Sequence, residues 1–275
     1  MTRRRQHVPW KAAGTASEQQ LSADDVVRGT GWVFNNQTGS ELSLAEFVST
    51  GDHEIEPYFH EFGLWTDEMA QQSIVEIGSG IGRMTAGLTR HFQKVVACDL
   101  DAAFLERCRE TVAQFGVPDR LQTSHVIDGR TLALPDDSAD VVFSYITLQH
   151  CHHDDALALV HEACRIAKPG AHVALNFRTW VPQDALLWPT GKLVRAIWRL
   201  PRIGPTLAQR RTLTRLGWQA NRLAPTEVMP LVAAGLDDIR LFRSPKRRGF
   251  KIAGTTDHTY VGVHPSHWWL VARVK

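Results

Sequence analysis

A glycine-rich turn followed by an acidic residue has the residue types and the spacing that cofactor chemistry requires. The apolar run Ile74 to Ile77 leads into Gly78-Ser79-Gly80-Ile81-Gly82, and the strand-like segment Lys94 to Cys98 ends in Asp99. Glycines let a ligand approach the backbone closely, and the start of a helix beyond the turn favours negatively charged groups. A carboxylate after the next strand can hold the hydroxyls of a ribose. The pattern therefore predicts a site for a nucleotide-like cofactor.

The spacing of the glycines separates two kinds of nucleotide site. The dinucleotide fingerprint G-x-G-x-x-G would require a glycine where this chain has Arg83. The observed pattern E-x-G-x-G-x-G, formed by Glu76, Gly78, Gly80 and Gly82, instead resembles motif I of the class I S-adenosylmethionine-dependent methyltransferases. Further matches follow in the family's order: Asp128-Gly129 after the strand-like run Val126-Ile127, Leu134-Pro135, Asp140 to Ser144, and the Lys168-Pro169-Gly170 turn into the fifth strand. The resemblance covers roughly residues 73–178 and is similar to the small-molecule, type 11-like members.

The resemblance implies that S-adenosylmethionine is the cofactor and that its methionine part lies on the glycine turn. Gly78, Gly80 and Gly82 would line this turn, and Glu76 would fix the turn or approach the cofactor's amino group. Arg83 would either steady the cofactor carboxylate or pair with a neighbouring acidic residue.

The same resemblance assigns residues to the nucleoside part of the cofactor. Asp99 would bind the ribose, and Leu100 would either pack against adenine or belong to the core. Asp128 would accept a hydrogen bond from the adenine amino group, with Gly129 and Arg130 offering backbone contacts beside it. Taken alone, Asp128-Gly129 would indicate a tight turn after a strand.

His150 is the candidate general base. It follows the fourth expected strand, whose end borders the reactive methyl group in this architecture, and imidazole titrates near neutral pH. The alternative is that His150 only packs or forms a hydrogen bond, and the weaker rivals are Tyr145, His258, His264 and His267. The string His150-Cys151-His152-His153-Asp154-Asp155 contains metal-ligand types, but consecutive residues rarely converge on one ion. We therefore predict no metal site.

The residues after the fourth strand also narrow the reaction class. Ser144-Tyr145-Ile146-Thr147 stands where adenine-N6 and glutamine methyltransferases have an N/D-P-P-Y/F motif. The chain has no Pro-Cys dipeptide, the usual signature of cytosine-C5 enzymes. Metal-independent O-methylation of a small hydrophobic metabolite or lipid is left as the leading hypothesis.

Periodicity predicts the elements that position these residues. Short apolar runs such as Val141 to Phe143 are typical of strands buried on both faces, and helical patterns such as Phe104 to Phe115 lie between them. Leu236 to Phe242 and Trp268 to Val274 would add the last two strands. We expect an α/β fold: a Rossmann-like, seven-stranded, mostly parallel sheet sandwiched by helices, with an N-terminal extension and a helical insertion after strand five.

The expected organisation is an N-terminal arm or cap at residues 1–60 and a methyltransferase domain at 61–275, which includes a helical lid insertion at 179–225. Residues 178–275 contain 17 Lys/Arg and 5 Asp/Glu, a net charge of +12, whereas residues 1–177 contain 14 and 24. We interpret Trp188, Arg195, Trp198 and Arg199 as lid residues that contact a hydrophobic acceptor with an acidic group. An ordinary solvated face and peripheral contact with an anionic membrane are the alternatives.

Two other functions fit the sequence. The basic cluster Lys246-Arg247-Arg248 makes an RNA or other nucleic-acid methyltransferase the second hypothesis, although no recognised RNA-binding module is present. A non-catalytic S-adenosylmethionine-binding protein is the third. Four cysteines without a C-x-x-C pair, and no apolar run near ~18 residues, lead us to expect a cytoplasmic protein. The sequence does not indicate an oligomeric state.

Overall fold

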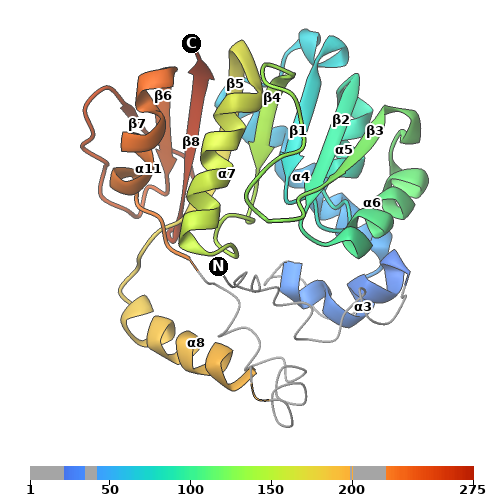
Figure 1. Ribbon diagram of the computed structural model, residues 1–275, viewed down its shortest axis with the longest axis horizontal. Coiled ribbons are helices and arrows are strands. Elements are labelled where there is room, and N and C mark those ends of the chain that lie inside the picture. Colours follow the sequence, from blue (N-terminus) through green and yellow to red (C-terminus); the bar gives the residue numbers. More distant parts are fainter. Residues whose placement is uncertain (1–21, 35–41, 199, 201–220) are drawn as a thin grey trace.

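The computed structural model describes residues 22–34, 42–198, 200 and 221–275 of the chain. These residues form a mixed sheet in the order β3-β2-β1-β4-β5-β8-β6-β7 (Figure 1). Its strands are β1 Ser73–Ile77, β2 Lys94–Asp99, β3 Leu121–His125, β4 Ala139–Ser144, β5 Ala167–Arg178, β6 Leu236–Arg243, β7 Thr256–Thr259 and β8 His267–Val274. Strands β1 to β5 are parallel, and β8 runs antiparallel to both β5 and β6.

The Rossmann-like fold is confirmed, with three differences in its strands. The described sheet has eight strands rather than seven, because the short polar strand β7 pairs with β6 at the edge. Strand β3 ends at His125, so the apolar run Val126-Ile127, expected within a strand, follows it. Lys168-Pro169-Gly170, expected as a turn before strand five, lies within β5, next to a break in its register with β4.

Helices cover both faces of the sheet. Helices α7 (His153–Ile166) and α11 (Pro225–Val232) pack on one face. Helices α4 (Leu44–Phe62), α5 (Thr85–His91) and α6 (Ala102–Phe115) pack on the other. Successive strand residues alternate between the two layers, so that Val142 faces α7 while Val141 and Phe143 face α4. Short 3-10 helices complete the fold at Asp67–Gln71, Pro118–Arg120 and Ala233–Gly235.

The N-terminal part contributes two helices to the body of the protein. Helix α3 (Ala23–Phe34) packs its first turns against α4 and α6. Helix α4 begins at a capping box, in which Ser43 Oγ accepts from Glu46 N and the Glu46 carboxylate accepts from Ser43 N. This helix runs without interruption through the predicted boundary at residue 60. The division into an arm and a domain stays a prediction.

Helix α8 (Asp184–Trp198) follows β5 and lies on the side of the sheet where the parallel strands end (Figure 1). Asp184, at its start, is fully buried, and its Oδ1 accepts from Arg178 at 3.1 Å and from Arg222 at 2.7 Å. These contacts fasten both ends of the insertion to the end of β5. No helix in the described part of the chain has the length and apolar character that a membrane crossing needs.

Candidate functional site

A cavity lies at the carboxyl ends of β1, β2 and β4. Its wall is formed by the turn after β1, the end of β2, parts of the loops after β3 and β4, and the side chains Phe47 of α4, Phe104 of α6 and Leu159 of α7. The parallel register pairs Ile77 with Cys98, which brings the glycine turn beside Asp99. Eight predicted site residues line this wall: Glu76, Gly78, Gly80, Arg83, Asp99, Leu100, Gly129 and His150.

The three glycines of the turn have different surroundings, so a side chain would have a different effect at each position. Gly78 has φ +81°, and a Cβ built on it would lie 2.1 Å from Thr147 Cγ2 of the loop after β4. A Cβ on Gly82 would lie 3.1 Å from Cys108 Sγ of α6. Gly80, with φ +57°, has no described atom within 4 Å of such a Cβ. Gly80 therefore faces open space, whereas Gly82 packs against a helix and lies off the cavity wall among the described residues.

Two buried carboxylates face this cavity. Glu76 is 4% exposed and accepts from Thr85 Oγ1 at 2.6 Å, and burial raises the pKa of Glu76 to about 7. Asp99 is 6% exposed and accepts from the backbone N of Gly80 at 2.9 Å and of Asp101 at 2.8 Å. Burial raises the pKa of Asp99 to about 6 although both hydrogen bonds oppose the shift.

The cavity suits S-adenosylmethionine on three structural grounds. Gly80 leaves room for a ligand against the backbone. Ser79 Oγ is buried, belongs to a residue of the wall, and has no hydrogen-bond partner among the described residues. The two carboxylates offer acceptors for the hydroxyl and amino groups that this cofactor carries. Such acceptors match the ribose and methionine ends of the molecule.

Arg83 pairs with an acidic residue, one of its two predicted roles. Its guanidinium forms an ion pair with Glu54 of α4 and lies 5.7 Å from the centre of the Tyr145 ring. Tyr145 Oη donates to the same Glu54 carboxylate at 3.2 Å. Sequence reasoning missed Glu54, because an acidic residue on an amphipathic helix gives no signal of its own. It ranked Tyr145 only as a rival base.

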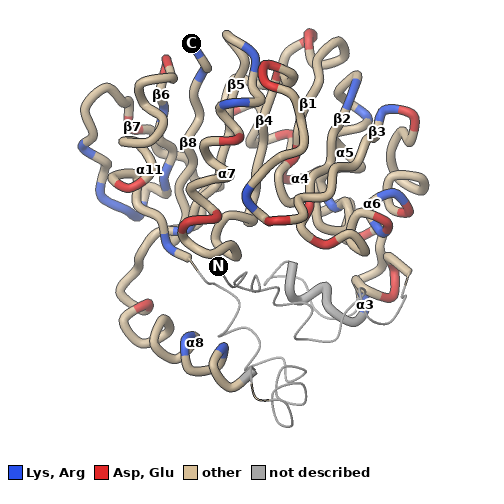
Figure 2. Tube along the Cα trace, viewed as in Figure 1, with Lys and Arg blue, Asp and Glu red and all other residues tan. Residues whose placement is uncertain are grey.

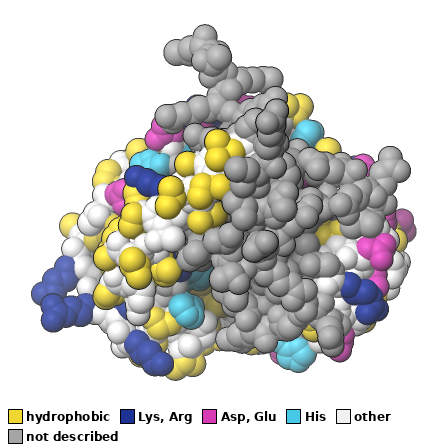
Figure 3. Space-filling model, turned by 90° about the horizontal axis from the view of Figure 1, so that it is seen from below, with side chains coloured by type: hydrophobic (Ala, Val, Ile, Leu, Met, Phe, Trp, Pro, Cys, Tyr) yellow, Lys and Arg dark blue, Asp and Glu magenta, His cyan; other side chains and the backbone are white. Residues whose placement is uncertain are grey.

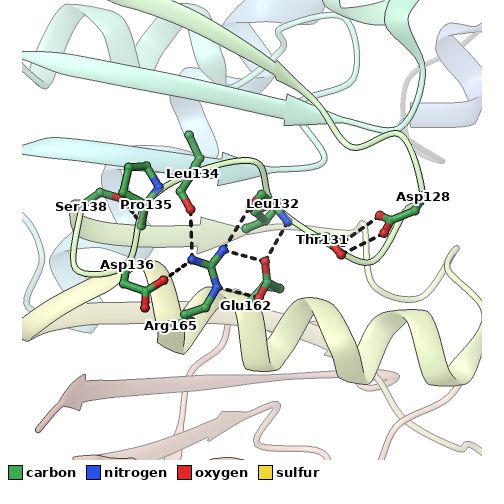
Figure 4. Close-up of polar contacts among 9 residues, drawn as sticks. All are labelled: Asp128, Thr131, Leu132, Leu134, Pro135, Asp136, Ser138, Glu162 and Arg165. Carbon is green, nitrogen blue, oxygen red and sulfur yellow. Dashed lines mark hydrogen bonds and ion pairs between the residues drawn. The ribbon is translucent and has the colours of Figure 1, made fainter.

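The loop after β3 holds Asp128 in a turn, and its predicted contact with adenine stays a prediction. Asp128 is exposed, and its carboxylate accepts from the backbone N of Arg130 at 2.9 Å. It also accepts from Thr131 N at 2.9 Å and from Thr131 Oγ1 at 2.8 Å (Figure 4). The tight-turn interpretation therefore describes its geometry. Of this trio of predicted residues, Gly129 lines the cavity, while Arg130 forms an ion pair with Asp155 at 3.0 Å.

Helix α7 holds the remainder of that loop in place. Arg165 donates to Leu134 O and Leu132 O, both at 3.0 Å, and to the carboxylates of Asp136 and Glu162 (Figure 4). Glu162 in turn accepts from Leu132 N at 2.8 Å. The wall on the Gly129 side is thus braced by a charged pair on one helix.

The loop after β4 brings His150 to the cavity. Ile146 has φ +53°, a left-handed conformation that is strained for a β-branched residue and is often found at functional sites. His150 N donates to Thr147 O at 2.9 Å, and its ring lies 3.2 Å from the Gln149 amide nitrogen. Cys151 and His152 line the cavity beside His150, whereas His153 contacts Asp154 and Glu227. The described residues contain no cluster of three metal-ligand side chains.

The predicted lid residues lie apart from the cavity wall as far as the structure describes them. Trp188 packs beneath Lys192, whose Nζ lies 3.4 Å from the ring centre, and Arg195 is half-buried. The side chain of Trp198 and the whole of Arg199 lie outside the described residues. Their role in acceptor binding stays a prediction.

The sequence has recognisable relatives. Residues 75–175 match a family model described as a methyltransferase domain. A carboxy-S-adenosyl-L-methionine synthase from Pseudomonas putida is 33% identical over 109 residues, which cover 38% of this chain and 44% of that protein. A protein of the same name from Pseudomonas fluorescens is 35% identical over 121 residues, 42% of this chain and 49% of the relative. The matches thus span about half the length of these relatives.

Solved structures show the same fold. An S-adenosylmethionine-dependent methyltransferase from Aquifex aeolicus has a TM-score of 0.50 at 16% identity, covering 86% of this chain and 100% of that one. An O-methyltransferase family protein from Burkholderia thailandensis also has a TM-score of 0.50, at 12% identity, covering 97% and 69%. At these identities the likeness concerns the fold.

Proposed function

Residues 75–175 belong to the class I S-adenosylmethionine-dependent methyltransferase family, and from this premise we propose that the protein methylates an oxygen atom of a small hydrophobic metabolite or lipid. The observation that supports this most is the cavity itself. It combines a glycine turn open at Gly80, two buried carboxylates, and His150 at the end of β4.

When bound, S-adenosylmethionine supplies an activated methyl group on a sulfonium. In this proposal Asp99 accepts hydrogen bonds from the ribose hydroxyls, and Glu76 holds the amino group beside the turn. Ser79 Oγ, buried without a partner among the described residues, gains one from the cofactor. His150 removes the proton from the acceptor hydroxyl, a contribution of ~10² to 10⁴-fold in rate. Alignment of the two reactants provides the larger part of the reduction in the activation barrier, up to ~7 to 11 kcal/mol.

The acceptor proposal follows from the rest of the wall and from the charge of the insertion. Phe47, Met84 and Tyr145 add apolar surface to the cavity. The excess of basic residues in 178–275 favours an acceptor with an acidic group. No residue in this scheme requires a metal ion.

Calorimetric titration with S-adenosylhomocysteine tests the cofactor part of the proposal. We expect micromolar binding that weakens more than about tenfold in Asp99→Ala, because the charged acceptor of hydrogen bonds from the ribose hydroxyls is lost. Asp119→Ala is the matched control, since Asp119 is an exposed acidic residue outside the cavity wall. Tighter binding of NAD, or no binding of S-adenosylhomocysteine, contradicts the assignment.

Carboxylation of the cofactor is the second candidate, favoured by the names of the two Pseudomonas relatives. In it the cofactor's methyl carbon would lose a proton and bond to the carbon of the carbon dioxide that a carboxyl donor releases. Mass spectrometry of the cofactor after turnover separates the two reactions. Methyl transfer yields S-adenosylhomocysteine, whereas the synthase reaction yields a cofactor that has gained a carboxyl group. Cofactor binding without either product, over a broad panel of acidic and lipophilic acceptors, would favour a binding protein without catalysis.

A further inference from the structure

The outward face of α8 is apolar, the reverse of the usual arrangement on a surface helix. The buried side of the helix includes Asp184 and Val194, whereas Leu186 and Leu193 are 74% and 63% exposed. The two leucines are seven residues apart and therefore lie on the same face, two turns from each other. Among the exposed α8 residues that the structure describes, Lys192 alone is charged. This face therefore lacks the polar side chains with which a solvated helix meets water.

A third exposed apolar residue, Trp180, and a basic loop adjoin this face. Trp180, just before α8, is 49% exposed. Arg247, in the loop that joins β6 to β7, donates to Trp180 O at 3.2 Å and to Pro265 O at 3.0 Å. Its neighbours Lys246 and Arg248 are exposed. The contact places basic side chains beside the apolar turn that leads into α8.

The figures show this combination on one side of the molecule. Basic residues gather in the loop between β6 and β7, on the same side as α8 (Figure 2). Seen from below, hydrophobic side chains crowd the region of α8, with basic side chains at and beside it (Figure 3). The surface formed by α8 and the loop between β6 and β7 therefore has an apolar centre and a basic rim.

We propose that α8 and the loop 245–248 dock the protein on an anionic lipid bilayer. Leu186, Leu193 and Trp180 enter the interfacial layer, and Lys192, Lys246 and Arg248 contact the phosphate head groups. The 15 residues of α8 extend about 22 Å, less than the ~30 Å of hydrocarbon in a bilayer, so the helix lies in the plane of the surface.

Charge and chemistry select this partner over two others. A second copy of this chain would present the same basic rim, and like charges oppose such a contact. A nucleic acid would be bound through its phosphates, which gives no reason for two exposed leucines on one helix face. An anionic bilayer complements both the basic rim and the apolar centre.

Co-flotation with vesicles tests the apolar half of the proposal. The full chain is mixed with vesicles of phosphatidylglycerol and phosphatidylcholine, or of phosphatidylcholine alone. We expect binding to the anionic vesicles, and at least a tenfold loss of affinity in Leu186→Asp/Leu193→Asp, because two apolar contacts are replaced by negative charges. The matched control is Leu231→Asp/Val261→Asp, which alters two exposed apolar residues elsewhere and should bind as wild type does.

The basic half is tested with Lys246→Ala/Arg248→Ala. Each charge near an anionic surface contributes about fivefold in affinity, so the double variant should bind markedly less and with a weaker salt dependence. Equal binding of wild type to neutral and anionic vesicles overturns the proposal, as does unchanged flotation of the leucine variant. Failure of wild type to float, together with a dimer that the leucine variant dissociates, identifies a second copy as the occupant and also overturns it.

Folding and function are read separately from docking. The altered residues lie off the cavity wall formed by the described residues, so each variant should keep the thermal midpoint and S-adenosylhomocysteine affinity of wild type. Because flotation needs neither cofactor nor acceptor, its result is independent of the proposed methyl transfer.

Discussion

Glu76 is a buried carboxylate that destabilises the unliganded protein when it ionises. Its pKa in the folded chain, about 7, exceeds the ordinary value of 4.5 because burial disfavours the charged form. The folded state therefore binds the proton more tightly than the unfolded state does. The resulting cost is absent below about pH 4.5, grows as the pH rises, and is complete above about pH 7.

We predict that Glu76→Gln stabilises the unliganded protein at pH 8 by up to about 3 kcal/mol. The amide can still accept from Thr85 Oγ1, which now bonds to Glu76 at 2.6 Å. The gain should vanish at pH 4, where the carboxyl group is protonated in both states. Urea unfolding at the two pH values measures this, and S-adenosylhomocysteine affinity should fall if the carboxylate holds the amino group. A variant no more stable than wild type at pH 8 would show that Glu76 ionises without cost.

His150 provides a second test at the scale of one residue. His150→Ala should lower kcat by ~10² to 10⁴-fold while S-adenosylhomocysteine binds with little change, because a general base acts on the acceptor rather than on the cofactor. His153→Ala is the control, since His153 contacts Asp154 and Glu227 and lies off the cavity wall among the described residues. Equal turnover in the two variants would assign His150 a packing role.

Among the elements, the strands covered on both faces could be predicted and those at the edges could not. Strands β1, β2 and β4 are almost wholly buried, so each is a nearly continuous apolar run. Strands β3 and β7 lie at the two edges of the described sheet and contain Gln122, Thr123, Asp257 and His258. An edge strand is only partly covered, and its hydropathy resembles that of a loop.

The glycine turn allows a paired prediction. Gly78→Ala must displace Thr147, whereas Gly80→Ala meets no described atom within 4 Å. Both residues have positive φ, which costs an alanine ~1 to 2 kcal/mol, and the overlap at Gly78 adds ~1 to 3 kcal/mol. Urea unfolding should therefore rank Gly78→Ala as the less stable variant. Gly80→Ala should instead lose cofactor affinity beyond its effect on stability, and equal unfolding midpoints would contradict this account.

Across the whole molecule, the insertion after β5 is fastened by one buried carboxylate. Asp184→Asn leaves Arg178 and Arg222 buried without a full counter-charge, so we expect a loss of about 3 kcal/mol or more. Trypsin should also cleave the insertion faster. Asp119→Asn, on the exposed surface, is the control. An unchanged thermal midpoint would mean that the cluster contributes nothing to the folded state.

The site residues that belong to sequence motifs could be predicted. The contacts between residues far apart in the sequence could not, because they depend on how the fold packs. Gly80 and Asp99 stand at fixed spacing beside one strand pair, so the sequence placed both. Glu54 reaches Arg83 and Tyr145 only because α4 packs across the sheet, and no local pattern encodes that contact. For Asp128 the family motif predicts a cofactor contact, whereas the described hydrogen bonds of its carboxylate close its own turn, so the contact with adenine stays a prediction.

The polar edge strands also affect how this protein behaves at high concentration. Unpaired N–H and C=O groups along an open sheet edge can recruit a strand from another chain, and apolar edge side chains promote that pairing. Here β3 and β7, which end the described sheet on its two sides, combine short length with polar or charged side chains. Such edges discourage growth of the sheet from one molecule to the next. The polar side chains of β3 and β7 thus have two effects. They make these strands hard to predict from hydropathy, and they protect the folded chain against aggregation.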